Sequence, residues 1–215
     1  MAGVTTPGRR ERNKQEKLSR ITAAARHLFR EKGFPAVTTR EIADVADIGE
    51  GTLFNYVQDK ADLLVLVYGD MIESAVERAF KECAAMGTLF EQMEHAYREL
   101  LRLYAADLDN YRHLVKYTMF DASPTPYGER AIAIWDRAQL LTRELIEAAQ
   151  RRGEIVQNVD ATTLARNLYA SFLLSLLQML TPAPGCGPQS SSAETDLAAA
   201  FTLQLEPLTE SSSDL

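Results

Sequence analysis

Basic and polar side chains near the N-terminus are the residues of this sequence best placed to do chemistry. Residues 1–32 contain nine Lys or Arg against three Glu, a net charge of +6. Residues 66–215 contain 12 basic and 21 acidic residues, a net charge of −9. A basic end on an acidic body suggests that a polyanion binds at that end only, although a solvated helix face would show the same charges.

Catalytic patterns are missing from the sequence. It contains no Ser/His/Asp or Cys/His arrangement, no paired-carboxylate signature and no metal-ligand triad. The segment Gly49–Phe54 (GEGTLF) lacks the glycine spacing and the lysine of a phosphate-binding loop. The two cysteines, Cys83 and Cys186, lie far apart and have no metal-ligand spacing. We therefore expect a protein that is not an enzyme and that holds no metal and no cofactor.

Length and composition are typical of a globular protein. The chain has 215 residues, of which 46% are hydrophobic and 25% charged, so it allows one large domain or a small module fused to a larger one. No apolar stretch reaches the roughly 18 residues of a membrane span, and the polar N-terminus has no apolar signal region. These features predict a soluble, cytoplasmic protein without a membrane partner.

The elements that must position the N-terminal polar residues are three helices. Apolar residues recur at helical spacing over residues 14–32, and Gly33 follows as a stop signal. Thr38 and Glu41 are spaced as a capping box that begins a helix of two turns. A second short helix is predicted from about residue 50 to 57, after a turn at residues 47–49.

The remainder of the sequence is also predicted to be helical, which makes the fold all-α. Long helices are expected from about residue 60 to 80 and over residues 89–106, 111–120, 127–152, 160–180 and 195–208. Residues 181–192 (TPAPGCGPQSSS) are predicted to form a flexible loop because they are rich in Pro, Gly and Ser. Residues 1–11 are expected to be a disordered basic tail.

Two short helices with a preceding helix packed across them form a helix-turn-helix plan. The second helix must direct polar groups into a major groove while a small core holds its other face. The polar face would carry Glu50, Thr52, Asn55 and Tyr56. The residues predicted to form the core are Ala25, Phe29, Ile42, Ala46, Ile48, Leu53 and Phe54.

Residues Ile21–Leu64 resemble the tetracycline-repressor (TetR) family of transcriptional regulators. The matching features are A-x-x-L-F-x-x-x-G-F, then T-T-x-x-I-A, then G-T-L-F-x-Y, and x-K-x-x-L-L at the start of the next helix. The resemblance implies an all-α protein with an N-terminal helix-turn-helix domain. It also implies a larger helical domain for ligand binding and dimerisation. We therefore expect a tail over 1–11, a DNA-binding domain over 12–59 and an effector-binding and dimerisation domain over 60–215.

The resemblance also implies which residues contact DNA around the first short helix. Thr38 and Thr39 would contact phosphates, and Arg40 would reach a phosphate or a base edge. Lys60 matches the family lysine at the start of the fourth helix and would contact phosphate. Lys17 would supply a further phosphate contact from the first helix.

The second short helix would be the recognition helix. Gly51 and Thr52 match positions where this helix meets DNA closely, and a side chain larger than glycine would hold the backbone away. Asn55 and Tyr56 match later groove or phosphate positions. Glu50 departs from a phosphate-binding pattern: its carboxylate suits the helix N-terminus but repels phosphate. It would therefore either face solvent as a capping group or accept a hydrogen bond from a cytosine amino group.

Two further departures from the family pattern concern the turn and the recognition helix. Asp47 replaces the usual glycine of the turn, and Asp tolerates a left-handed backbone better than most residues. Phe54 replaces a common tyrosine and so lacks a hydroxyl that could bind phosphate.

The larger helical region is expected to bind a small effector and to form a homodimer. Aromatic and methionine side chains predict an apolar or aromatic ligand, although such a stripe is also typical of plain core. The candidate ligand-binding residues are Met71, Met93, Tyr97, Tyr117, Phe120, Trp135, Tyr169 and Phe172. Small residues on the last two helices would allow close helix approach between two copies. The candidate interface residues are Ala170, Ser171, Ser175, Ala198, Ala199 and Thr202.

The interpretation that follows is a ligand-responsive transcriptional regulator, most often a repressor in this family. It would bind a palindromic double-stranded DNA operator as a dimer and be released by a small apolar or aromatic effector. The alternative is a helical small-molecule-binding or interaction protein without specific DNA binding, which Glu50 and a pI of about 5.1 would favour.

Overall fold

The computed structural model describes residues 8–83, 87–121, 125–181 and 190–209. Within these ranges the chain is helical and forms no β-strand, which confirms the predicted all-α class. In chain order the helices are α1 (Arg9–Lys32), η1 (Phe34–Ala36), α2 (Thr39–Val45), α3 (Glu50–Leu53), α4 (Asp62–Cys83), α5 (Leu89–Ala105), α6 (Leu108–Lys116), η2 (Tyr117–Asp121), α7 (Pro126–Arg151), α8 (Ala161–Leu180), α9 (Ser190–Leu205) and η3 (Glu206–Leu208).

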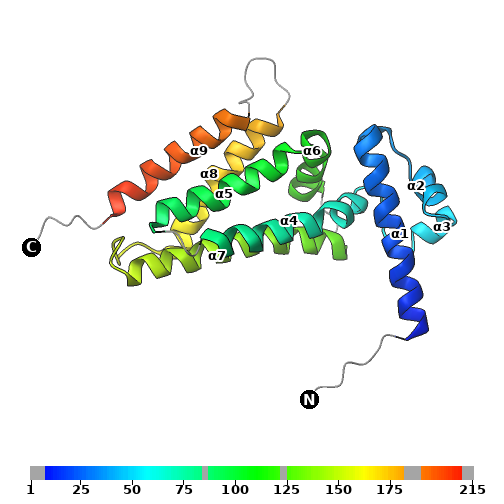
Figure 1. Cartoon of the computed structure of the whole chain (residues 1–215), viewed down its shortest axis with the longest axis horizontal. Coiled ribbons are helices and arrows are strands. Elements are labelled where there is room, and N and C mark those ends of the chain that lie inside the picture. Colours follow the sequence, from blue (N-terminus) through cyan, green and yellow to red (C-terminus); the bar gives the residue numbers. More distant parts are fainter. Residues whose placement is uncertain (1–7, 84–86, 122–124, 182–189, 210–215) are drawn as a thin grey trace, which may run out of the picture.

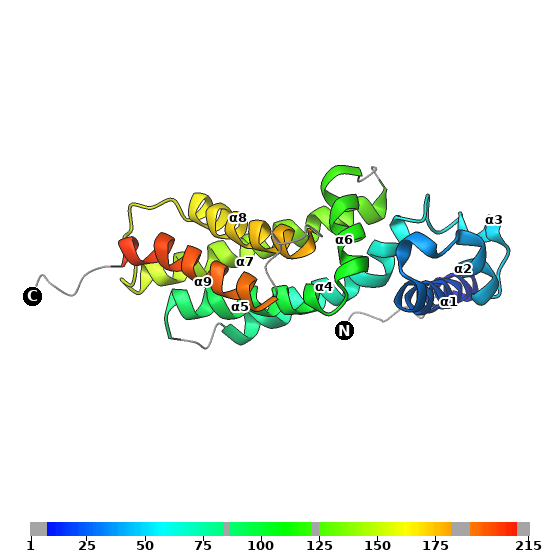
Figure 2. The same cartoon turned by 90° about the horizontal axis from the view of Figure 1, so that it is seen from above.

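The molecule is elongated, with α1, α2 and α3 at one end and a bundle of longer helices at the other (Figure 1). Helix α4 leads from the small end into the bundle, where it packs against α5 and α7. Helix α9 packs on α5, α8 packs on α7, and α8 and α9 pack on each other. The view from above shows the same separation of the small end from the bundle (Figure 2).

Local signals in the sequence set the boundaries of the first two helices. Helix α1 ends at Gly33, whose φ of 75° lies in the left-handed region that glycine adopts without steric cost. The Thr38 hydroxyl accepts the Glu41 amide at 3.2 Å, and the Glu41 carboxylate accepts the Thr38 amide at 2.8 Å. The predicted capping box at the start of α2 is therefore confirmed.

The turn between α2 and α3 passes through Asp47, which has a φ of 52°. It is the one non-glycine residue at positive φ within the described ranges. Asp adopts this conformation more readily than most residues, so the turn forms without the usual glycine. Arg20 of α1 adds a hydrogen bond to the Asp47 carboxylate at 3.3 Å.

The small core around α1, α2 and α3 differs from the prediction at one residue. Phe54 is 48% exposed, so its assignment to the core was wrong. Helix α3 ends at Leu53, and the inward positions belong to Leu53 and Val57. Phe54 is the next residue round the helix and therefore faces outward. The other predicted core residues are buried, except for the half-buried Ile48: Ala25, Phe29, Ile42, Ala46 and Leu53.

Three predicted boundaries also need correction. Helix α3 was expected to reach residue 57, but beyond Leu53 the next amides form turn hydrogen bonds: the Asn55 amide donates to the Thr52 carbonyl at 3.2 Å and the Tyr56 amide to the Leu53 carbonyl at 2.9 Å. Helix α1 begins at Arg9 because the Arg and Glu residues there are good helix formers, so the expected tail over 1–11 is too long. Helix α9 begins at Ser190, inside the loop predicted over 181–192. Residues 1–7 and 182–189 of these two segments lie outside the described residues.

Aromatic side chains fill the middle of the bundle. Tyr97 is fully buried, and its ring lies 5.0 Å from that of Phe172 and 5.6 Å from that of Phe201. The Tyr97 hydroxyl and the Thr142 hydroxyl are 2.6 Å apart, so the one polar atom of this side chain is satisfied inside the core.

None of the helices within the described residues combines the length and the apolar character needed to cross a bilayer.

Candidate nucleic-acid interface

The residues expected to contact DNA lie on or beside the helices of the small end. Figure 1 shows α2 and α3 on the outer side of α1, away from the bundle. A large partner can therefore approach these two helices without meeting the bundle. Five of the candidate residues are exposed: Thr38, Arg40, Glu50, Gly51 and Asn55. The other five are half-buried: Lys17, Thr39, Thr52, Tyr56 and Lys60.

Arg40 and Gly51 are both open to an external partner. The exposed Arg40 side chain has no hydrogen bond or ion pair to the described part of the chain, so its guanidinium group can meet an external acceptor. Apart from its chain neighbours and the backbone of its own helix, a Cβ atom at Gly51 would find no atom within 4 Å. The fold of the chain itself therefore does not require glycine at this position.

Glu50 and Thr39 bind each other across the two short helices. The Thr39 hydroxyl donates to the Glu50 carboxylate at 2.8 Å. Because Glu50 is exposed at the N-terminus of α3, its negative charge faces any polyanion that approaches α2 and α3. The sequence-based alternatives for Glu50, a capping role or a cytosine contact, did not include this interaction with Thr39.

A network of charged and polar groups holds the start of α2. Lys32 of α1 donates to the Glu41 carboxylate at 2.8 Å, and the same carboxylate accepts the Thr38 hydroxyl at 2.9 Å. Hydrogen bonding by Lys32, and then by Thr38, lowers the pKa of Glu41 to about 2. The N-terminus of α2 is therefore fixed to α1 over the neutral pH range.

Lys60 has neighbours that the sequence did not predict. Its ammonium group donates to the carbonyl oxygens of Phe34 and Val37, both at 2.7 Å, and lies 4.3 Å from the centre of the Phe34 ring. Burial lowers the pKa of this lysine. In this structure Lys60 fixes the segment between α1 and α2. The phosphate contact expected of it stays a prediction.

Asn110 of α6 connects the bundle to the small end. Its side-chain amide donates to the Phe29 carbonyl at 2.9 Å, and its carbonyl oxygen accepts the Phe34 amide at 2.9 Å. Asn110 is 2% exposed, so these hydrogen bonds are shielded from water. Helix α6 is thereby tied to the end of α1 and to the segment that leads into α2.

Asp62, at the start of α4, forms a second buried connection. Its carboxylate accepts the Gln58 amide at 2.9 Å, the Tyr117 hydroxyl at 2.8 Å and the Thr125 hydroxyl at 2.9 Å. Burial and the hydrogen bond to Asp62 raise the pKa of Tyr117 to about 12. The segment after α3 is thus joined to η2 and to the start of α7.

The candidate ligand-binding residues do not gather around one pocket. Met93, Tyr97, Tyr169 and Phe172 are buried in the bundle, the last three within the aromatic cluster. Tyr117 is bound to Asp62, and Phe120 is 75% exposed. Trp135 and Met71 line two separate hollows. Which of these residues contact a ligand stays a prediction.

An apolar cavity lies among α4, α6 and α7. Trp135 is the one candidate residue that lines it, together with groups such as Gly69, Ile72 and Ile134. Its volume is about 20 Å³, close to the space that one water molecule needs. Thr118 of the π-helical turn η2 also lines this cavity and directly follows Tyr117. A larger molecule could enter only if the surrounding helices moved apart.

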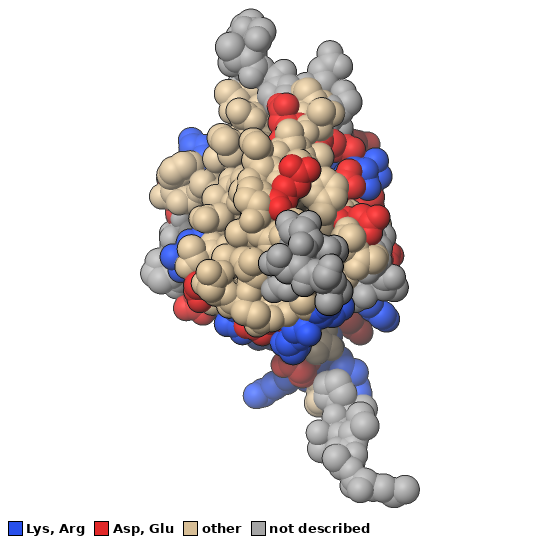
Figure 3. Space-filling model, turned by 90° about the vertical axis from the view of Figure 1, so that its left-hand side faces the viewer, with Lys and Arg blue, Asp and Glu red and all other residues tan. Residues whose placement is uncertain are grey.

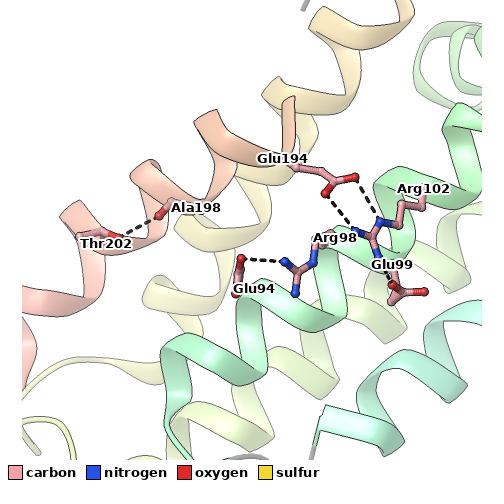
Figure 4. A network of polar contacts seen from close by, with 7 residues as sticks. All are labelled: Glu94, Arg98, Glu99, Arg102, Glu194, Ala198 and Thr202. Carbon is pink, nitrogen blue, oxygen red and sulfur yellow. Dashed lines mark hydrogen bonds and ion pairs between the residues drawn. The ribbon is translucent and has the colours of Figure 1, made fainter. Parts of the chain in front are cut away.

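The candidate dimer residues face in different directions on α8 and α9. Ala170 and Ala199 are exposed, whereas Ser175 is buried. The Thr202 hydroxyl donates to the Ala198 carbonyl of its own helix at 3.0 Å (Figure 4). The sequence prediction missed the two large apolar side chains exposed on these helices, Leu174 at 58% and Leu203 at 78%. Each lies one helical turn after a candidate alanine, a spacing that could have revealed it.

An intramolecular ion pair joins the side of α9 that faces α5 to that helix. Figure 4 shows Arg102 of α5 between Glu194 of α9 and Glu99 of its own helix, at 3.2 and 2.9 Å. Arg98 and Glu94 pair nearby at 3.0 Å. This side of α9 is used within the chain, so a second copy would have to meet another side.

The end of the molecule opposite α1–α3 has a different surface. Figure 3 shows that uncharged residues cover most of this face and that acidic side chains gather along one side of it. A hollow of about 460 Å³ is lined by residues at the starts or ends of helices, including Leu89, Gly153, Glu154 and Leu205. Glu154 accepts the Leu89 amide, so this carboxylate already has a partner.

Comparisons with known proteins agree with this geometry. Residues 21–67 match the model of bacterial regulatory proteins of the tetR family. An uncharacterised HTH-type transcriptional regulator of Bacillus subtilis (strain 168), YvkB, is 33% identical over 84 residues, which are 35% of this chain and 44% of that protein. The HTH-type transcriptional repressor KstR of Mycobacterium tuberculosis is 26% identical over 168 residues, 78% of this chain and 72% of the repressor.

Solved structures extend the similarity over the bundle. The crystal structure of Thermus thermophilus FadR, a TetR-family transcriptional repressor in complex with lauroyl-CoA, matches with a TM-score of 0.69 and 25% identity. That match covers 92% of this chain and 98% of FadR. A TetR transcriptional regulator from Rhodococcus sp. RHA1 matches with a TM-score of 0.63 and 19% identity over 92% of this chain and 99% of the other, which shows a shared fold.

Proposed function

The chain belongs to the tetR family of bacterial regulatory proteins, and from this premise we propose that it is a ligand-responsive transcriptional repressor. Residues 12–59 would bind DNA, and residues 60–215 would bind the effector and form a homodimer. The observation that carries the proposal is the accessible surface of α2 and α3, where Arg40, Gly51 and Asn55 face outward. We further propose that the protein catalyses no reaction and acts in the cytoplasm, where bacterial operators are.

Dimerisation would bring two such surfaces onto one operator. A two-fold pair of recognition helices reads two half-sites about 34–36 Å apart, so the site would be a palindrome. Exposed Leu174 and Leu203 support an interface on α8 and α9, because burying a large apolar side chain contributes about 1.5–3 kcal/mol. Exposed Ala170 and Ala199 would let the helices of the two copies approach closely.

The proposed effector has an apolar part that enters the cavity among α4, α6 and α7. Two facts support this: the lining is mainly apolar, and the similar repressor FadR of Thermus thermophilus was crystallised with lauroyl-CoA. Because the cavity of about 20 Å³ is too small for such a molecule, binding would favour a wider arrangement of helices. Asp62, Tyr117 and Asn110 connect those helices to α1–α3, so the wider arrangement would present α3 differently to DNA.

Operator binding is the experiment that tests the proposal. Purified protein would be footprinted on the intergenic DNA next to its own gene and, if that DNA has no site, on sequences selected from the genome. We expect protection of a palindrome and a steep loss of affinity with added salt. Arg40→Ala should weaken binding about tenfold or more. Arg78 is an exposed arginine on α4, so Arg78→Ala is the matched control and should leave binding unchanged.

The alternative is a helical binding protein without specific DNA recognition. The pair of Glu50 and Thr39 favours it, because a carboxylate at the start of α3 opposes phosphate. The same assay separates the two functions. An equal affinity for all DNA sequences at low salt, both for the intergenic DNA and for the sequences selected from the genome, would support the alternative and contradict the repressor.

Effector response needs a separate measurement on the operator complex. Lauroyl-CoA is the first probe, because of the similarity to FadR. We expect it to lower operator affinity and to change the fluorescence of Trp135, the one tryptophan of the chain. Release of DNA without a change in Trp135 fluorescence would place the effector outside this cavity.

A further inference from the structure

A cleft separates α1 from the bundle and is much larger than the internal cavity. Its walls include Arg26 and Arg30 of α1, Tyr68 and Met71 of α4, and Tyr111 of α6. We name it the α1 cleft. Its volume of about 480 Å³ falls within the range of small-molecule sites. No rearrangement of helices is needed to admit a ligand of moderate size.

Positive charge predominates in the α1 cleft. Arg30 is exposed and has no hydrogen bond or ion pair to the described part of the chain. Arg26 makes a long hydrogen bond of 3.4 Å to the Val67 carbonyl, which leaves most of its donors available. Asp107 also lines the cleft, but its carboxylate already accepts the Tyr68 hydroxyl at 2.6 Å and the Asn110 amide at 3.1 Å. The cleft is therefore lined by two positively charged arginines and one carboxylate, and the oxygens of that carboxylate already accept hydrogen bonds from the protein.

A buried hydroxyl group in the wall of the cleft has no partner. Tyr111 is 1% exposed, and no described residue forms a hydrogen bond with its hydroxyl group. An unsatisfied buried hydroxyl costs free energy, and a small movement of the cleft wall that lets a ligand's acceptor oxygen reach Tyr111 would recover it. Charged arginines and a phenol donor together are the groups that bind a carboxylate or a phosphate.

Apolar groups in the same cleft indicate what the anion is attached to. Met71 is 42% exposed, and Leu103 and Ala106 also contribute to the lining. The Tyr111 ring lies between those of Tyr68 and Tyr104, with centroids 4.9 and 4.8 Å away and the rings tilted to each other, and Tyr104 lines the internal cavity. A row of tyrosines thus connects the α1 cleft to the apolar cavity.

We propose that the α1 cleft binds the anionic group, a carboxylate or a phosphate, of a small organic acid with an apolar portion. The anion is held by Arg26 and Arg30, with Tyr111 as a further donor. Because these residues come from α1 on one side and α6 on the other, the bound molecule spans the DNA-binding helices and the bundle. Any difference in affinity between the DNA-bound and free arrangements then couples this site to operator binding.

Calorimetric titration of the full-length protein without DNA tests the site. The probes are decanoate, 1-decanol, which has the same chain length but no charge, and inorganic phosphate. We expect decanoate to bind at least about tenfold more tightly than 1-decanol. Arg30→Gln and Arg26→Gln should each weaken decanoate binding about tenfold and leave 1-decanol unchanged, because one charge-assisted hydrogen bond is lost.

Two further variants separate a binding role from a structural one. Tyr111→Phe removes only the unpartnered hydroxyl group, so it should preserve or raise stability while it weakens decanoate binding about threefold or more. Arg78→Gln removes an exposed charge from α4 outside the cleft and should change nothing. Unchanged decanoate binding in both cleft arginine variants would overturn the proposal. Equal affinities for decanoate and 1-decanol would also overturn it. The same holds if neither decanoate nor phosphate binds.

The titration with inorganic phosphate distinguishes a free anion from the head group of a larger ligand. Phosphate that competes with decanoate, and loses affinity in Arg30→Gln, would show that the cleft also accepts a free anion. Decanoate binding without phosphate competition would show that the cleft accepts the head group of a larger ligand. Since no DNA is present, failure of the operator experiment would leave this result intact.

Discussion

The small end and the bundle hold their functional groups over very different distances along the chain. Thr38 is fixed by Glu41, three residues away, and Thr39 binds Glu50, eleven residues away. In the bundle, Asp62 is bound by Tyr117 and Thr125, which are 55 and 63 residues away. A local contact needs only one short helix or two adjacent ones, whereas the distant contacts exist only when several long helices are packed. Substitutions in the two regions should therefore have different kinds of effect.

The largest effect on stability is expected where the two regions meet. Asn110→Ala would leave the buried Phe29 carbonyl and Phe34 amide without partners, which should cost about 3 kcal/mol of unfolding free energy. Urea denaturation measures this loss. Asn55→Ala, an exposed asparagine of the small end, is the control and should change stability by less than about 0.5 kcal/mol. Equal losses in the two variants would remove the distinction between the regions.

A smaller gain in stability is expected in the wall of the internal cavity. A Cβ atom at Gly69 would lie 3.5 Å from Arg130 and from Val65, which are ordinary contacts. Gly69→Ala should therefore stabilise α4 by up to about 1 kcal/mol. It should also narrow the cavity and weaken the effector response about tenfold without changing operator affinity. Thermal unfolding and effector titration check the two parts, and an unchanged response would exclude this cavity as the effector site.

On the DNA-facing surface, removing a charge should affect binding but not folding. Glu50→Gln keeps a hydrogen-bond acceptor for Thr39 but removes the negative charge at the start of α3. Affinity for non-operator DNA should rise about threefold, a typical size for one exposed charge. Fluorescence anisotropy at several salt concentrations measures this. Unchanged affinity for non-operator DNA would show that the Glu50 charge does not oppose phosphate.

The smallest effect is the pH dependence of the α2 cap. The pKa of Glu41 is lowered from 4.5 to about 2 by Lys32 and Thr38, so folding favours its ionised form. The stabilisation is complete above the unfolded-state pKa of 4.5 and is lost as the pH falls through about 2. Glu41→Gln should therefore be less stable than the wild type at neutral pH, and the difference should shrink in acid. Chemical denaturation of both proteins at pH 6, 4 and 3, chosen to bracket this window, checks the direction.

The difference between local and distant contacts also explains which structural roles could be predicted from the sequence alone. Gly33, the Thr38 and Glu41 pair and Asp47 act through their own conformations or near neighbours, so their roles were predictable. Phe54 was misplaced because the exact end of a short helix decides which of two adjacent residues faces inward.

The candidate effector site was less predictable because it depends on distant helices. An aromatic residue at helical spacing, such as Tyr97 or Trp135, has the same sequence pattern whether it packs in a core or lines a cavity. Asn110 and Asp62 were missed for a related reason: the chain segments they join are far apart in the sequence. A polar residue inside an apolar helical stripe was the one local signal that could have indicated them.

Gly51→Ala tests directly whether the exposed surface of α2 and α3 binds DNA. Apart from its chain neighbours and the backbone of its own helix, no atom lies within 4 Å of the added methyl group, and alanine favours helix more than glycine does. We expect the variant to be as stable as the wild type, or more stable by up to about 1 kcal/mol, and to bind the operator at least about tenfold more weakly. Wild-type operator affinity in a stably folded Gly51→Ala protein would contradict DNA binding by this surface.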